Sequence, residues 1–119
     1  MNKVITKHQL NRILKTVYPG GYGKDNTRYG YQDDWFIGWL GINNKSQAGL
    51  PMEVNIDGDG TYIIFTWWDK CYDQMTNDEI AAYLRGVMSQ IMPDMVLDEE
   101  GSKPNATHVA FKFVDDEND

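Results

Sequence analysis

The sequence contains one cysteine and two histidines, the residue types that most often act as nucleophile and base in catalysis: Cys71, His8 and His108. A nucleophilic thiolate needs a neighbouring base that takes its proton near neutral pH. His8 falls in the first turn of an expected helix, and His108 opens an expected strand on its outward side, so neither is placed beside Cys71. We therefore expect Cys71 to be a buried or half-buried structural residue.

Acids beside tryptophans form the second set of candidates, because paired carboxylates among aromatic rings can line a glycosidase cleft. Asp33 and Asp34 precede Trp35, and Asp69 follows Trp67-Trp68. A chain with 18 acids produces such neighbours readily, and hydrolysis also requires two carboxylates spaced across a cleft. The sequence contains no phosphate-binding glycine loop, zinc spacing or nucleophile elbow. We expect a protein that is not an enzyme.

The closest match to a metal motif is Asn55, Asp57, Asp59 and Gly60, which occupy positions one, three, five and six of a calcium loop. Position twelve is Thr66 where a bidentate glutamate is required, and the flanking segments have strand patterns where helices belong. Glycine and aspartate tolerate positive φ, so we interpret residues 57–60 as a hairpin turn. We expect no metal and no cofactor.

Residues 18–34 have neither helical nor strand periodicity and are rich in glycine and tyrosine, which indicates a long structured loop. Tyrosine offers a flat amphipathic surface at low entropic cost, as in recognition loops. Three uses stay open: contact with a partner protein, binding of single-stranded nucleic acid or a small ligand, and simple packing of the tyrosines onto the sheet. The expected binding residues are Tyr22, Lys24, Arg28, Tyr29, Tyr31 and Trp35.

Charge is distributed unevenly along the chain, whose net charge is −7. Residues 1–24 carry a charge of +5 with no acid, and the rest of the chain carries −12. An acidic body repels phosphate backbones, so we expect no duplex nucleic acid partner. The first helix should expose a basic stripe of Lys7, Asn11, Arg12 and Lys15, which either meets other molecules or pairs with the protein's own acids.

Two helices are indicated by capping boxes, in which a threonine and a residue three positions later satisfy each other's backbone N–H groups. Thr6 with Gln9 starts a helix over about 7–17, and Pro19-Gly20-Gly21 ends it. Thr76 with Glu79 starts a second helix over about 77–92, which Pro93 ends. The apolar positions of both helices follow helical spacing, so each should pack one face on a sheet.

Strands are expected at 35–42, 52–57, 61–68, 95–97 and 108–113, with polar connections at 43–49 and 98–107. The segment 35–42 is apolar on both faces, which fits a central strand or a face kept for a partner, and Gly38 and Gly41 should leave room for a bulky neighbour. The segment 52–57 should expose its polar face. The pattern predicts an α+β fold in the order α-β-β-β-α-β-β, with an antiparallel sheet of four to five strands and two helices on one face.

The chain's length of 119 residues favours one domain, over 1–114, followed by a frayed acidic tail at 115–119. A single cysteine excludes an internal disulfide and favours a reducing compartment. No apolar run is long enough for a membrane span, and the first residues lack the apolar region of a secretory signal. We expect a cytoplasmic protein without a membrane partner.

Small size, an acidic surface and an aromatic loop without a catalytic constellation are typical of a protein that acts by binding another protein. The expected partner has a basic surface. Accessory inhibitors of the immunity-protein or phage-encoded, mobile-element kind share this profile, although no stretch carries the signature of a named family. Two alternatives remain: a single-stranded nucleic acid or small-ligand binding module that uses the tyrosine loop, and a structural homodimer built on 35–42.

Overall fold

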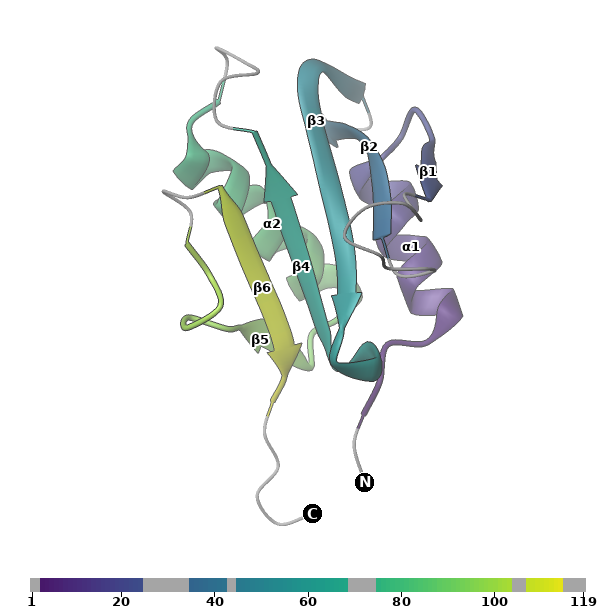
Figure 1. The fold of residues 1–119 in the computed structure, drawn as a ribbon, viewed down its shortest axis with the longest axis vertical. Coiled ribbons are helices and arrows are strands. Elements are labelled where there is room, and N and C mark those ends of the chain that lie inside the picture. The colour runs from purple at the N-terminus through teal and green to yellow at the C-terminus, as the bar shows by residue number, and fades with distance from the viewer. Residues whose placement is uncertain (1–2, 25–34, 43–44, 69–74, 104–106, 115–119) are drawn as a thin grey trace.

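The computed structural model describes residues 3–24, 35–42, 45–68, 75–103 and 107–114 (Figure 1). The expected tail at 115–119 lies outside these residues. The elements follow in the order α1 (Lys7–Val17), β1 (Tyr22–Lys24), β2 (Trp35–Ile42), β3 (Lys45–Asp57), the 3-10 turn η2 (Gly58–Gly60), β4 (Tyr62–Trp67), α2 (Asn77–Ile91), β5 (Met95–Leu97) and β6 (His108–Phe113).

Both helices begin where the capping boxes predict. The Gln9 backbone N–H donates to Thr6 Oγ1 at 3.1 Å, and the Thr6 N–H donates to Gln9 Oε1 at 2.9 Å. Thr76 and Glu79 repeat the arrangement at 3.2 and 3.0 Å. Because each cap satisfies two backbone donors that the helix itself leaves unpaired, it fixes the first turn locally. The sequence therefore located both starts without knowledge of the fold.

The α+β class and the antiparallel sheet are confirmed, but the expected number of strands is wrong. Within the described residues the strand order is β1-β2-β3-β4-β6-β5, six strands in all, and Lys103 adds an isolated bridge to His108. The order along the chain gains one strand before β2. That strand, β1, lies in the segment expected to be a loop, where it pairs with β2 through Tyr22↔Gly38 and Lys24↔Phe36. Three residues are too few to show a strand period, so no sequence pattern predicts this strand.

The expected polar connection at 43–49 is also wrong from Lys45 onward, because β3 begins there. The register with β2 shifts between Trp39 and Gly41, and pairing then continues through Gly41↔Ser46 and Ile42↔Lys45. A bulge of this kind lets a strand keep its partner while it bends. The polar residues Lys45 and Ser46 at the start of β3 are thus paired with β2, which the sequence pattern alone does not reveal.

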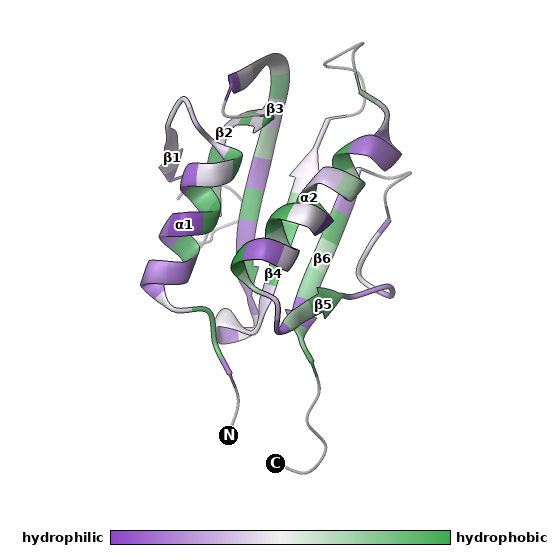
Figure 2. Cartoon of the chain, turned by 180° about the vertical axis from the view of Figure 1, so that it is seen from behind, coloured by the Kyte–Doolittle hydropathy of each residue, from purple (hydrophilic) through white to green (hydrophobic). Residues whose placement is uncertain are grey.

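Both helices cover the same face of the sheet, as Figures 1 and 2 show from opposite sides. The cross-strand row Phe36, Val54, Phe65 and Val109 faces the helices, and all four side chains are buried. They join one apolar cluster with α1 and α2, so a single core serves both helices. No helix in the described ranges is long and apolar enough to cross a membrane.

The C-terminus of α1 is fixed by Tyr18, which packs against a glycine in β2. A Cβ on Gly38 would lie 2.6 Å from Tyr18 Cδ1, and one on Gly41 would clash with Pro19 Cγ. The expectation that these glycines leave room for bulky neighbours is confirmed. The Tyr18 hydroxyl donates to the Met52 carbonyl at 2.6 Å, so α1 is tied to both β2 and β3.

Candidate functional site

The expected binding residues that the structure describes lie on two faces of the sheet. Tyr22 and Lys24 pair with Gly38 and Phe36, and their side chains therefore share the face that the helices cover. Trp35 precedes Phe36 in β2 and faces the opposite side, where it is half-buried. Arg28, Tyr29 and Tyr31 lie outside the described residues. Tyr22 and Lys24 are brought together, and Trp35 is separated from them.

Tyr22 and Lys24 line a groove with a volume of about 760 Å³ that runs between α1, β1 and η2. Its apolar lining consists of Ile5, Leu10, Leu14, Phe36 and Ile56. Its polar lining, apart from Tyr22, consists of Thr6, Lys7, Asn11, Lys24, Asp59 and Gly60. The groove depends on α1 lying beside β1, two segments whose relative placement no local pattern encodes, so sequence reasoning missed it.

Aromatic rings form one wall of this groove. The Tyr22 ring lies 5.9 Å from Tyr18 and 5.9 Å from Phe36, the latter in an edge-to-face arrangement at 82°. Tyr18 is buried, and this burial raises the pKa of its hydroxyl far above the ordinary value, with the nearby Glu53 carboxylate adding to the shift. Tyr22 remains 40% exposed. It therefore packs on the sheet, which is one of the three uses considered from the sequence, and it also presents part of its ring to solvent.

The basic stripe of α1 is exposed at Lys7, Asn11, Arg12 and Lys15. In the part of the chain that the structure describes, Lys7, Arg12 and Lys15 make no ion pair. The ion pairs that do occur there join Lys3 to Asp94 at 3.5 Å and Lys112 to Asp98 at 3.9 Å. The alternative that the protein's own acids neutralise the stripe therefore finds no support among these residues.

The sheet face away from the helices holds two buried polar residues that the sequence placed on an exposed face. Glu53 is 2% exposed and Asn55 is 6% exposed, so the expectation of a half-exposed β3 is wrong for both. Their cross-strand neighbours Ile37 and Trp35 are large and apolar, which lowers the exposure of the polar face. Asn55 Oδ1 makes no hydrogen bond with any residue that the structure describes, an uncommon state for a buried acceptor. The same face exposes Trp39 at 50%.

The residues considered for catalysis and metal binding do not converge where the structure describes them. His8 is exposed on α1, and His108 is half-buried in β6. Asp57 Oδ1 accepts from the Gly58 N–H at 2.8 Å and so caps η2, where Asp59 adopts a φ of 56°. The hairpin interpretation of residues 57–60 is confirmed. Among the described residues, no three histidine, cysteine, aspartate or glutamate side chains could hold a metal ion together.

The remaining catalytic candidates, Cys71, Asp33, Asp34 and Asp69, lie outside the described residues.

Comparison with protein-family models, curated proteins and solved structures found no match to this chain.

Proposed function

We propose that this chain is a non-catalytic binding protein that acts by associating with another protein whose surface is basic. The observation that carries the proposal is a pair of exposed carboxylates, Glu99 and Glu100, on a turn at the sheet edge opposite the exposed cations of α1. The helix α1, which carries the exposed cations Lys7, Arg12 and Lys15, lies beside β1 at one edge of the sheet (Figure 1). The acidic turn, residues 98–102, follows β5 at the opposite edge. Charges kept apart in this way create a field that can steer a partner to one side.

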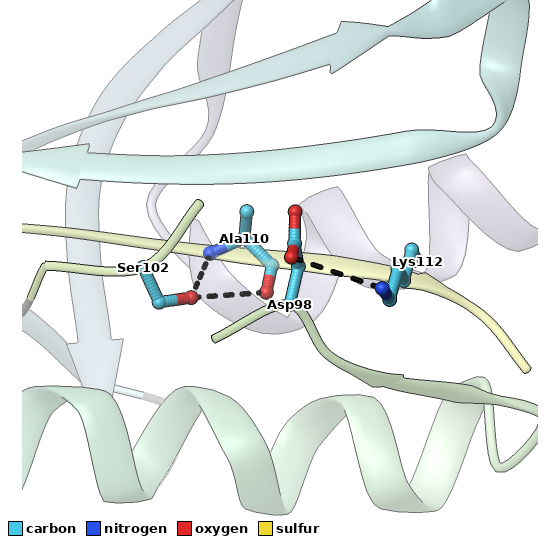
Figure 3. A network of polar contacts seen from close by, with 4 residues as sticks. All are labelled: Asp98, Ser102, Ala110 and Lys112. Carbon is cyan, nitrogen blue, oxygen red and sulfur yellow. Dashed lines mark hydrogen bonds and ion pairs between the residues drawn. The ribbon is translucent and has the colours of Figure 1, made fainter. Parts of the chain in front are cut away.

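The acidic turn, residues 98–102, is held firmly against β6 (Figure 3). Ser102 Oγ accepts from the Ala110 N–H at 2.9 Å and donates to the Ala110 carbonyl at 3.3 Å. The Asp98 N–H donates to the same carbonyl at 2.9 Å, and the Asp98 carboxylate lies 3.9 Å from Lys112 Nζ. Because the turn is ordered before any partner arrives, less conformational entropy is lost on binding.

Two carboxylates project from this turn. Glu99 and Glu100 are both exposed, and neither makes an ion pair with another described residue. Exposed carboxylates without internal cations are available to the lysines and arginines of a basic partner. Inhibitors of the immunity-protein or phage-encoded accessory type act through acidic surfaces of this kind, and we place the present chain in that functional class as part of the proposal.

The proposal is tested by affinity capture of partners on the tagged protein at low salt, followed by association kinetics with the retained protein. Glu99→Gln/Glu100→Gln should slow association about three- to tenfold, because charges at the rim of an interface act chiefly on the association rate. Ser89→Lys/Gln90→Lys changes the net charge by the same amount at exposed positions of α2 and serves as the control. Retention of no protein, equal affinity at low and high salt, or equal rates for the two double variants would contradict the proposal.

A structural homodimer is the second candidate, favoured by Trp39. This side chain is 50% exposed on the sheet face that carries no helix, so its burial against a second copy of the chain would be favourable. Sedimentation velocity of the protein and of Trp39→Ser over a concentration series decides between the candidates. A dimer that the substitution dissociates would support self-association, and a monomer at all concentrations would exclude it.

A further inference from the structure

The groove beside α1 has walls that backbone and side-chain contacts fix in place. Its first wall is α1, which begins at the Thr6 cap. At one end the segment before α1 is fastened to η2, because the Ile5 N–H donates to the Gly60 carbonyl at 2.9 Å. The opposite wall is β1, whose Tyr22 ring rests on Tyr18 and Phe36. A groove built on paired elements is preformed, which is the usual condition of small-ligand sites.

The lining of the groove divides into an apolar part and a cationic part. Leu14, Phe36 and Ile56 are buried side chains whose edges line it, and Leu10 adds a half-buried one. Lys7 and Lys24 line the same space and are exposed. Its volume of about 760 Å³ falls in the range of roughly 300–1,000 Å³ that small-molecule sites occupy. An apolar ligand body with one negative group would meet both parts.

Electrostatics favours an anion over a cation or a neutral group. Lys7 makes no ion pair with any described residue, and the first turn of α1 contains no acidic side chain. The backbone N–H groups of a helix's first turn add positive potential at the end where Lys7 stands. Asp59 lines the groove from η2 and opposes this potential, so its charge should lower the affinity for an anion.

We propose that this groove binds a small anionic amphiphile, namely a carboxylate attached to an apolar chain, with its head at Lys7 and Lys24 and its chain against Leu10, Leu14 and Phe36. This site is separate from the acidic turn assigned to the protein partner. The two proposals can therefore succeed or fail independently.

The direct test is titration of the isotope-labelled protein with decanoate, monitored by ¹H–¹⁵N correlation spectra. We expect saturable shifts at Lys7, Leu10, Tyr22 and Phe36. Decanol and decyltrimethylammonium carry the same chain with a neutral and a cationic head. They should bind at least about tenfold more weakly, because only the carboxylate gains from both lysines and the helix end.

Substitutions give a second, independent readout. Lys7→Gln/Lys24→Gln should weaken decanoate binding about three- to tenfold, which corresponds to two partly exposed charge contacts. Arg12→Gln/Lys15→Gln removes the same charge from α1 at exposed positions that do not line the groove, and should leave the affinity within about twofold. Asp59→Asn removes the opposing charge and suits the positive φ at this position, so it should tighten binding.

Three results would overturn the proposal. They are chemical shift changes spread over the sheet face that bears Trp39, equal affinity for decanoate and decanol, and an equal loss of decanoate affinity in the Lys7/Lys24 and Arg12/Lys15 double variants. The spectra of the unsubstituted protein decide the location of the site even if a variant fails to fold. Loss of decanoate binding would leave capture of a basic protein partner unaffected, so a failure here is distinguishable from a failure of the proposed function.

Discussion

Replacing Gly38 by alanine should destabilise the protein because the Tyr18 ring occupies the space that a side chain needs. The added Cβ would lie 2.6, 2.9 and 3.0 Å from three atoms of that ring. Carbon atoms pack at about 3.5–4.0 Å, so the ring must move by about 1 Å. The ring is buried, and the movement strains the hydrogen bond from its hydroxyl to Met52, which is 2.6 Å long.

The size of the effect follows from three contributions. Overpacking of a core site costs about 1–3 kcal/mol. Loss of the hydrogen bond adds about 1 kcal/mol. Replacement of a strand glycine by alanine raises the free energy of unfolding by about 0.5–1 kcal/mol, because it lowers the conformational entropy of the unfolded chain. We expect Gly38→Ala to lower the free energy of unfolding by about 1–3.5 kcal/mol, measured by urea denaturation at equilibrium.

Two matched variants make the explanation specific. A Cβ on Gly23 in β1 would have no atom of another described residue within 4 Å, so Gly23→Ala should leave stability within about 0.5 kcal/mol of the unsubstituted protein or raise it. In a Tyr18→Ala background the ring is gone, and Gly38→Ala should then cost nothing. An equal loss with and without Tyr18, or no loss in the original background, would refute this account of the packing.

Three further predictions concern buried polar groups, all measured by urea denaturation. Ser102→Ala should lower the free energy of unfolding by about 1–3 kcal/mol, because it leaves the buried N–H of Ala110 without its acceptor. An unchanged urea midpoint of unfolding would contradict this prediction. Asn55→Val should leave the free energy of unfolding unchanged or raise it by up to about 1 kcal/mol, since the Oδ1 that it removes makes no hydrogen bond with a described residue. A large decrease in the free energy of unfolding would contradict this prediction. The pKa of the Tyr18 hydroxyl is raised in the folded protein, so folding favours the neutral form of this side chain. The resulting stabilisation is complete at pH values below the ordinary tyrosine pKa of 10.0 and declines as the pH rises above that value. Tyr18→Phe should therefore lose less stability between pH 8 and 10.5 than the unsubstituted protein, and parallel losses would contradict this.

The helices were predictable because their start signals are local. Thr6 with Gln9 and Thr76 with Glu79 satisfy backbone groups within four residues, and Pro19 and Pro93 follow each helix end closely. The η2 turn was predictable for the same reason, since Asp57 caps it and glycine and aspartate accept its positive φ values. In each case the residues that determine the conformation are neighbours in sequence.

Features that depend on distant partners were not predictable. The strand β1 exists because Tyr22 and Lys24 pair with β2, and the start of β3 at Lys45 depends on a bulge opposite Trp39 and Gly41. The alternating pattern predicts correctly that Glu53 lies on the opposite face from Met52 and Val54. It does not predict that Glu53 is buried, because burial depends on side chains from other strands. The groove likewise requires α1 to lie beside β1, so its residues became a site only in the fold.

The burial of Glu53 and Asn55 bears on how the two faces of the sheet are used. The face toward the helices is filled by apolar side chains from every long strand, which is what stability alone favours. On the other face, β3 buries the Glu53 carboxylate and the Asn55 amide. Asn55 Oδ1 makes no hydrogen bond with a described residue, which costs free energy relative to an apolar residue of similar size. Residues that lower stability in a well-packed fold concentrate at positions that serve another purpose. If Asn55→Val stabilises the isolated protein while weakening its capture of a partner, this face contributes to association, and the acidic turn then supplies only part of the interface.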